Sequence, residues 1–124
     1  MSTHNTSDHT PLDGVTLDGT TTQQQTVILM KGQRGLSMIW TWTGTLAASL
    51  GLEISNNYNE QRPGLARWTP VTDSSLVAQL SSGAPNGTAG SSSLQISPIH
   101  CRAVRFTANR SGSSGTFSLD VSRA

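Results

Sequence analysis

The stretch LSMIWTWTGTLAASLGLEIS, residues 36–55, decides the fold class of this chain. Its first half places large apolar side chains at every second position, namely Leu36, Met38, Trp40 and Trp42. Its second half repeats the alternation from Leu46 to Ile54, after a turn at residues 43–45. A period of two is the pattern of a β-strand with one apolar face, whereas a helix over 46–54 has the wrong period and must accommodate Gly51. We therefore predict two strands here and expect both tryptophans to be core residues.

Turn-forming residues separate further segments of the same kind. We predict strands at 25–30, 67–71, 76–80, 94–96, 102–108 and 117–121, with turns or loops at 31–35, 55–65, 81–93 and 109–115. Seven or eight short strands about ten residues apart indicate an all-β fold, an antiparallel β-sandwich or a jelly-roll-like domain.

The composition agrees with strands and turns. Of 124 residues, 34 are Ser or Thr, and only 12% are charged, against about 25% in an average protein. A net charge of +1 gives no bulk attraction to nucleic acid or to an anionic membrane. The single cysteine excludes an internal disulfide. The N-terminus carries no basic segment followed by an apolar one, so we expect the protein to be made and used in a reducing cytoplasm.

The first 23 residues are nearly all polar, and only Leu12, Val15 and Leu17 offer apolar anchors. Such a segment buries too little apolar surface to offset its own ordering entropy. We therefore divide the chain into an extended N-terminal arm, residues 1–23, and a β-sandwich domain, residues 24–124. Either its own domain or a neighbouring subunit must order the arm. We predict the neighbouring subunit, so that deleting residues 1–19 leaves the sandwich folded.

Catalytic patterns are absent from the sequence. It holds no Gly-x-Ser-x-Gly elbow, no phosphate loop and no dinucleotide fingerprint. Adjacent residues of a strand point to opposite faces, so His100 and Cys101 make a poor dyad. The spacing of His4, Asp8 and His9 matches no known metal site. We predict no enzyme activity, no cofactor and no metal.

The aromatic residue Trp68 leaves two readings open. Beside the loop that carries Tyr58 and Arg62, it is either a core residue or a ring on which a sugar stacks. We place Glu53 on the solvent face of its strand, and we expect Arg102 and Arg105 to serve local pairing or a subunit contact rather than phosphate binding.

The order of strands and turns also resembles a known class of proteins. The resemblance covers about residues 24–122 and is carried by the segments 42–46, 53–57, 68–71, the Gly/Ser-rich stretch through Gly90, 103–107 and 114–119. The chain is similar to small β-sandwich virion proteins of tailed bacteriophages, which decorate or cement heads or serve as small tail components.

The resemblance implies a structural protein of the virion that docks on the major capsid protein or other virion subunits as a homo-oligomer. Attachment would combine area burial with backbone pairing, repeated over many copies. The alternative is a tail or head-spike adsorption module that binds host-surface glycans. The candidate partner-binding residues are Leu12, Val15, Leu17, Tyr58, Arg62 and Trp68.

Overall fold

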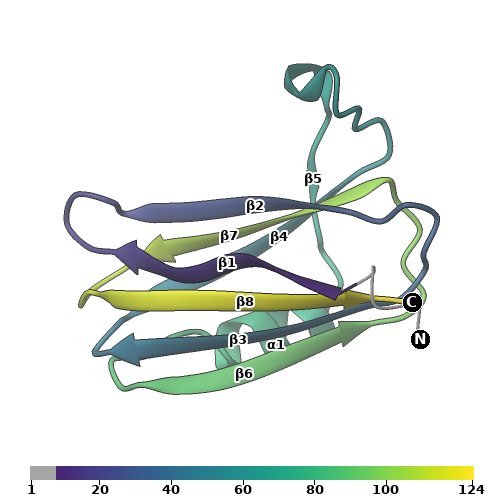
Figure 1. Ribbon diagram of the computed structural model, residues 1–124. Coiled ribbons are helices and arrows are strands. Elements are labelled where there is room, and N and C mark those ends of the chain that lie inside the picture. Colours follow the sequence, from purple (N-terminus) through teal and green to yellow (C-terminus); the bar gives the residue numbers. More distant parts are fainter. Residues whose placement is uncertain (1–7) are drawn as a thin grey trace, which may run out of the picture.

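The alternating segments pair into two antiparallel sheets that pack face to face (Figure 1). The computed structural model describes residues 8–124. The first sheet has the order β1-β8-β3-β6, with bounds Asp8–Leu17, Gly115–Arg123, Leu36–Gly44 and Gly90–Ile96. The second has the order β2-β7-β4-β5, with bounds Gln23–Leu29, Ala103–Arg110, Ala48–Ser55 and Thr69–Pro70. The prediction of an all-β sandwich of seven or eight strands is confirmed.

The core lies between the sheets and is built on aromatic rings. The ring of Phe106 in β7 lies 5.9 Å from that of Trp40 in β3 and 5.9 Å from that of Phe117 in β8, measured between centroids. Trp40 is fully buried and Trp42 is 7% exposed, which confirms the prediction for both. The indole Nε1 of Trp40 donates to the carbonyl oxygen of Gly83 at 2.9 Å. The buried Trp40 therefore also holds in place the segment at Gly83, which lies outside both sheets.

The prediction of an extended N-terminal arm is wrong for residues 8–17, which form strand β1. Residues 8–17 pair along β8 of the same chain, with Leu12 opposite Leu119. Leu12 is 5% exposed and Leu17 is fully buried, while Val15 packs partly buried against the same core. These side chains are anchored in their own sandwich and not on a neighbouring subunit. The boundary expected after residue 23 is likewise not found, because β1 is a strand of the first sheet; residues 1–7 lie outside the described residues.

The turn after β1 holds a carboxylate by backbone hydrogen bonds. Asp18 Oδ1 accepts from the N–H groups of Thr21 at 2.7 Å and Thr20 at 2.8 Å. Both bonds lower the pKa of the Asp18 carboxyl, and the bond from Thr21 has the larger effect.

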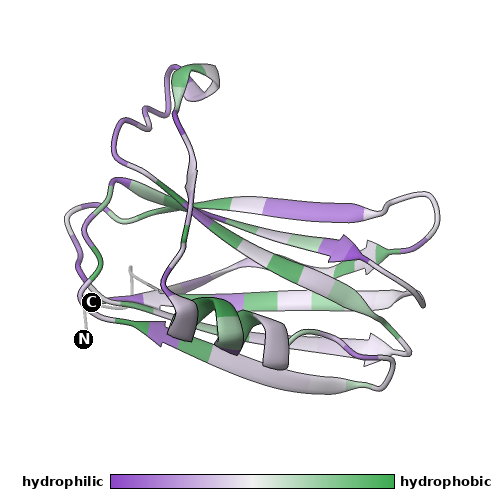
Figure 2. Cartoon of the chain, turned by 180° about the vertical axis from the view of Figure 1, so that it is seen from behind, coloured by the Kyte–Doolittle hydropathy of each residue, from purple (hydrophilic) through white to green (hydrophobic). Residues whose placement is uncertain are grey.

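The strand predicted at 76–80 is wrong, because residues Ser74–Ser82 form the helix α1. The side chain of Asp73 caps it, accepting from the N–H groups of Ser75 and Leu76 at 3.0 and 3.1 Å. The helix buries Leu80 and contacts β4 of one sheet and β6 of the other. It therefore covers one open side of the sandwich, as Figure 2 shows from behind.

The remaining differences concern strand ends. The segment predicted at 67–71 contributes only the two residues of β5, and β6 begins at Gly90, inside the predicted loop 81–93. Residues 56–68 lack strands, as predicted for the part up to residue 65, and contain one 3-10 turn, Pro63–Leu65. They rise away from the sandwich in Figure 1.

Candidate functional site

The segment 56–68, called the projecting segment below, is held in shape by one asparagine. Asn57 Oδ1 accepts from Ser55 Oγ at 3.0 Å and from the backbone N–H of Arg67 at 2.8 Å. Its Nδ2 donates to the carbonyl oxygen of Leu65 at 3.2 Å. Because one side chain joins both limbs, the segment has a defined conformation although it stands outside the sandwich.

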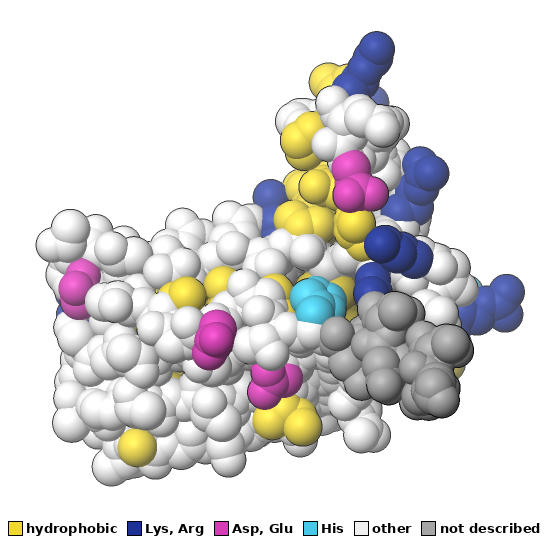
Figure 3. All heavy atoms as spheres, viewed as in Figure 1, with side chains coloured by type: hydrophobic (Ala, Val, Ile, Leu, Met, Phe, Trp, Pro, Cys, Tyr) yellow, Lys and Arg dark blue, Asp and Glu magenta, His cyan; other side chains and the backbone are white. Residues whose placement is uncertain are grey.

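The tip of the projecting segment combines an exposed apolar side chain with cations. Leu65 is 65% exposed, one of the large hydrophobic side chains that the sandwich leaves in solvent. Arg62 and Arg67 are exposed beside it, and their guanidinium groups have no hydrogen-bond or ion-pair partner in the described part of the chain. Figure 3 shows apolar and basic groups together on this protrusion.

The base of the projecting segment is an aromatic and ionic cluster. The rings of Tyr58 and Trp68 are 5.7 Å apart, and the guanidinium carbon of Arg105 lies 4.6 Å from the Trp68 ring centroid. Arg105 also binds Glu53, with Nη2 at 2.6 Å and Nε at 2.8 Å from the same carboxylate oxygen. Trp68 is half-buried and stands outside the main core. Arg105 lies over one face of the Trp68 ring, while part of the tyrosine and tryptophan surface remains exposed to solvent.

The structure brings together some of the predicted site residues. Tyr58, Arg62 and Trp68 belong to the projecting segment. Leu12 and Leu17, in contrast, lie on β1 of the first sheet and are buried in the core between the sheets. Sequence reasoning missed the role of Glu53, expected to face solvent alone. Its signal was available in the strand register, because Glu53 lies directly opposite Arg105. The expectation of local pairing for Arg105 is confirmed.

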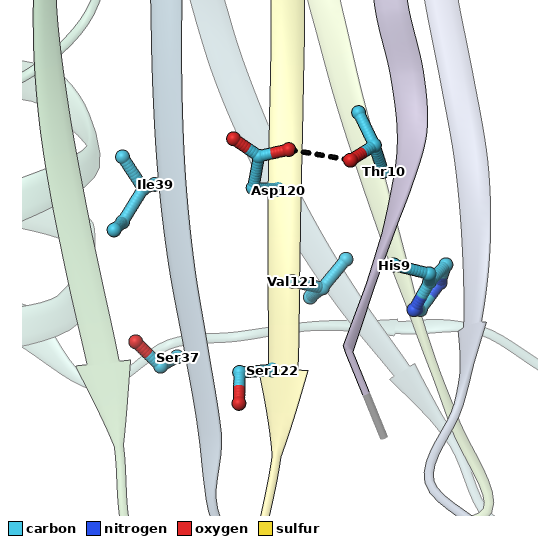
Figure 4. Close-up of a pocket in the computed structure, with 7 residues that line it drawn as sticks. All are labelled: His9, Thr10, Ser37, Ile39, Asp120, Val121 and Ser122. Carbon is cyan, nitrogen blue, oxygen red and sulfur yellow. Dashed lines mark hydrogen bonds between the residues drawn. The ribbon is translucent and has the colours of Figure 1, made fainter. Parts of the chain in front are cut away.

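A hollow lies on the outer face of the first sheet, away from the projecting segment (Figure 4). It has a volume of about 410 Å³ and is lined by Ser37, Ile39, Ser122 and neighbours on β1 and β8. Asp120 accepts a hydrogen bond of 2.6 Å from Thr10 Oγ1, and Figure 4 shows His9 on the other side of β1. The hollow thus combines a carboxylate that accepts from a hydroxyl with the exposed apolar side chain of Ile39.

The remaining candidates for chemistry do not converge. Cys101 is half-buried, and burial raises the pKa of its thiol, an effect that a backbone hydrogen bond at Ala103 partly opposes. A thiol with a raised pKa is a poor nucleophile at neutral pH. His100 is exposed beside it. Within residues 8–124 no three His, Cys, Asp or Glu side chains are placed to hold a metal ion, and His4 lies outside this range. No helix in this range is long and apolar enough to cross a membrane.

Comparisons with known proteins find likenesses of chain trace only. No family model and no curated protein matches the sequence. A chitosan-binding module of a chitosanase/glucanase from Paenibacillus sp. IK-5 is 15% identical, with a TM-score of 0.44, covering 92% of this chain and 74% of the module. The enzymatically active domain of tailspike protein 4 of bacteriophage CBA120 is 10% identical, with a TM-score of 0.47, and the match covers 82% of this chain and 14% of the tailspike. A chain of infectious bursal disease virus, Gx strain, is 14% identical with a TM-score of 0.41, covering 92% of this chain and 30% of the viral one.

Proposed function

We propose that this chain is a non-enzymatic structural protein of a virion, which docks on the phage capsid as a decoration or cement protein through its projecting segment. The observation that carries the proposal is the tip of that segment, where the 65% exposed Leu65 stands between Arg62 and Arg67. The docking role passes from the arm to this segment, because the anchors expected in the arm are buried.

The residue types of the segment suit a protein partner. Aromatic side chains and arginine are enriched at protein interfaces and among the residues that carry their binding energy. Burying Leu65 against a partner would contribute about 1.5–3 kcal/mol. Because Asn57 already fixes both limbs, little conformational entropy is lost on docking. One copy would bind modestly, and stable attachment would come from many copies on one shell.

The test is complementation of a phage that lacks the gene. Particles are supplied with the wild-type chain, with Leu65→Ser combined with Arg62→Gln, or with Val77→Ser as the control. Val77 is a matched control because it is an apolar residue, 46% exposed, on the helix α1. We expect the double variant to fold normally but to be lost from purified particles, which become less resistant to heat. Wild-type incorporation of the double variant would refute docking by this segment.

A second candidate function is binding of host-surface glycans by the Tyr58 and Trp68 rings. The half-buried, tilted ring pair at the base of the segment favours it. Sugars are recognised by aromatic rings that stack on their apolar faces, and by polar groups that orient the hydroxyls. An array of glycans probed with the full chain and with Tyr58→Ala tests this role. No glycan retained above background by the wild-type chain would exclude it.

A further inference from the structure

Three loops meet at the end of the sandwich from which the projecting segment rises. The first residue of β7, Ala103, lies opposite both the last residue of β2, Leu29, and the last residue of β4, Ser55. The turn after β2, the start of the projecting segment and the loop before β7 are therefore neighbours in space. Figure 3 shows most dark-blue side chains gathered toward this end of the molecule.

Two of these loops contribute exposed cations without a partner among the described residues. Lys31 and Arg34 come from the turn after β2 and Arg102 from the loop before β7. Their side chains make no hydrogen bond or ion pair with the described residues. The backbones are nevertheless fixed: Arg102 N–H donates to Ser55 O at 2.9 Å, and Ile99 N–H donates to Arg34 O at 2.6 Å.

Two hollows at this end share Arg102 as a lining residue. The larger, of about 550 Å³, is lined by Lys31, Tyr58, Asn59, Glu60 and Gln61, among others. The smaller, of about 310 Å³, includes Arg34 and His100. Pockets for small ligands typically have volumes of about 300–1,000 Å³.

The turn that presents Lys31 has a conformation that does not favour lysine. Gln33 N–H donates to Met30 O at 2.9 Å, and both central residues have positive φ, 51° for Lys31 and 81° for Gly32. Such turns favour Asn-Gly or Gly-Gly, because other side chains are crowded at positive φ. The turn itself would be more stable with asparagine or glycine at position 31. A lysine in this strained conformation, at a hollow, therefore indicates that its side chain serves a function.

We infer that this end of the sandwich binds an anionic carbohydrate, a sugar carrying carboxylate or phosphate groups. The inference rests on the carbohydrate-binding candidate above and adds the ligand's charge and the residues that read it. Lys31, Arg34 and Arg102 neutralise the anionic groups, Tyr58 supplies a stacking ring, and the Asn59 and Gln61 amides bond to hydroxyls. Glu60 accepts from a sugar hydroxyl.

The shape of the surface favours a sugar over an acidic protein partner. The two hollows share Arg102 as a lining residue, and the larger one is also lined by Tyr58. Such a concave surface suits a small ring-shaped ligand, whereas an acidic protein surface needs a broad, flat contact. The larger hollow also contains the amide residues Asn59 and Gln61, which the neutralisation of an anionic group alone would not require. Amide groups donate and accept hydrogen bonds, which matches a ring of hydroxyls.

The experiment is calorimetric titration of the full chain with a tetramer of galacturonic acid and a neutral tetramer of galactose. Inorganic phosphate and a short polyglutamate peptide are titrated in parallel. The variants are Lys31→Gly, which suits the positive φ, and Arg102→Gln. Arg110→Gln removes one charge at the opposite end of β7 and is the control. Melting curves establish that each variant is folded.

We expect the acidic tetramer to bind at least about tenfold tighter than the neutral one. Lys31→Gly and Arg102→Gln should each weaken it by about tenfold or more, since a hydrogen bond to a charged group is worth about 1.5–3 kcal/mol and 1.4 kcal/mol is tenfold. Arg110→Gln should bind like wild type. Equal affinity for both tetramers would overturn the charge inference and leave the carbohydrate role standing. No binding of either tetramer would overturn both, and equal binding of phosphate or polyglutamate would replace the sugar by a simple anion site.

Discussion

Strand β1 makes the strongest prediction, because its anchors measure whether the N-terminal segment belongs to the sandwich. Leu17 is fully buried and Leu12 is 5% exposed. Replacing a buried leucine by alanine costs about 2–5 kcal/mol, the spread reflecting how well the cavity collapses. The two residues lie opposite Leu119 and Gly115, four positions apart on β8, hence about 14 Å from each other at about 3.4 Å per residue. Costs at such a distance add, giving about 4–10 kcal/mol for the double variant.

That sum is comparable to the whole stability of a typical domain, about 5–15 kcal/mol. Urea unfolding followed by tryptophan fluorescence is the assay. With a slope of about 2 kcal/mol per molar urea, each single substitution should lower the midpoint by about 1–2.5 M. Thr16→Ala, on the exposed face of the same strand, should change stability by less than about 0.5 kcal/mol. A chain lacking residues 1–19 that melts like the full chain would refute this reasoning and restore the detachable arm.

Four further outcomes follow from the geometry. Alanine at Trp40 or Trp42 should cost about 3–5 kcal/mol in urea unfolding, and wild-type stability would remove these rings from the core. Asp73→Ala should cost about 1 kcal/mol by losing the helix cap, with the thermal midpoint as readout. The lowered pKa of Asp18 means that its contribution is present above the unfolded pKa and lost as pH falls through the folded one, so Asp18→Asn should flatten the acid limb of stability against pH. The raised pKa of Cys101 predicts slower alkylation by iodoacetamide than a small free thiol at pH 8, and equal rates would contradict it.

The strands that the sequence revealed are those in which one apolar face alternates without interruption. In β3, and in β7 from Val104 onward, the buried positions fall at every second residue. For these two, the predicted strands agree with the observed ones within two residues. Strand β1 was missed because its register shifts between His9 and Leu12 and again between Leu12 and Val15. Gly14, with φ of 60°, lies in the second shift. Bulges of this kind insert extra residues, so the period of two that identifies a strand disappears from the sequence.

The helix α1 was missed for a different reason. Residues 76–80 contain four apolar side chains in a short window, which fits a strand and a helix equally well. What decides the matter is Asp73, whose carboxylate bonds the N–H groups of the first turn, together with the sandwich side that Leu80 covers. The cap is visible in sequence as Asp before Ser-Ser, but the apolar surface that the helix covers exists only once the two sheets have formed.

The candidate site was the least predictable feature, because it is produced by strand register and not by any local motif. Lys31 and Arg102 are 71 positions apart and belong to no basic run, yet the pairing of β2 with β7 makes their loops neighbours. A net charge of +1 argues against attraction to any anionic partner, since opposite charges cancel in the sum. Charge acts locally, however, because salt screens the electrostatic interaction of an exposed group over a distance of about 8 Å at physiological ionic strength. The unpartnered cations Lys31, Arg34 and Arg102, on two adjoining loops, therefore support the proposed anionic ligand although the net charge of the chain is only +1. Their proximity follows from the strand register and not from the composition.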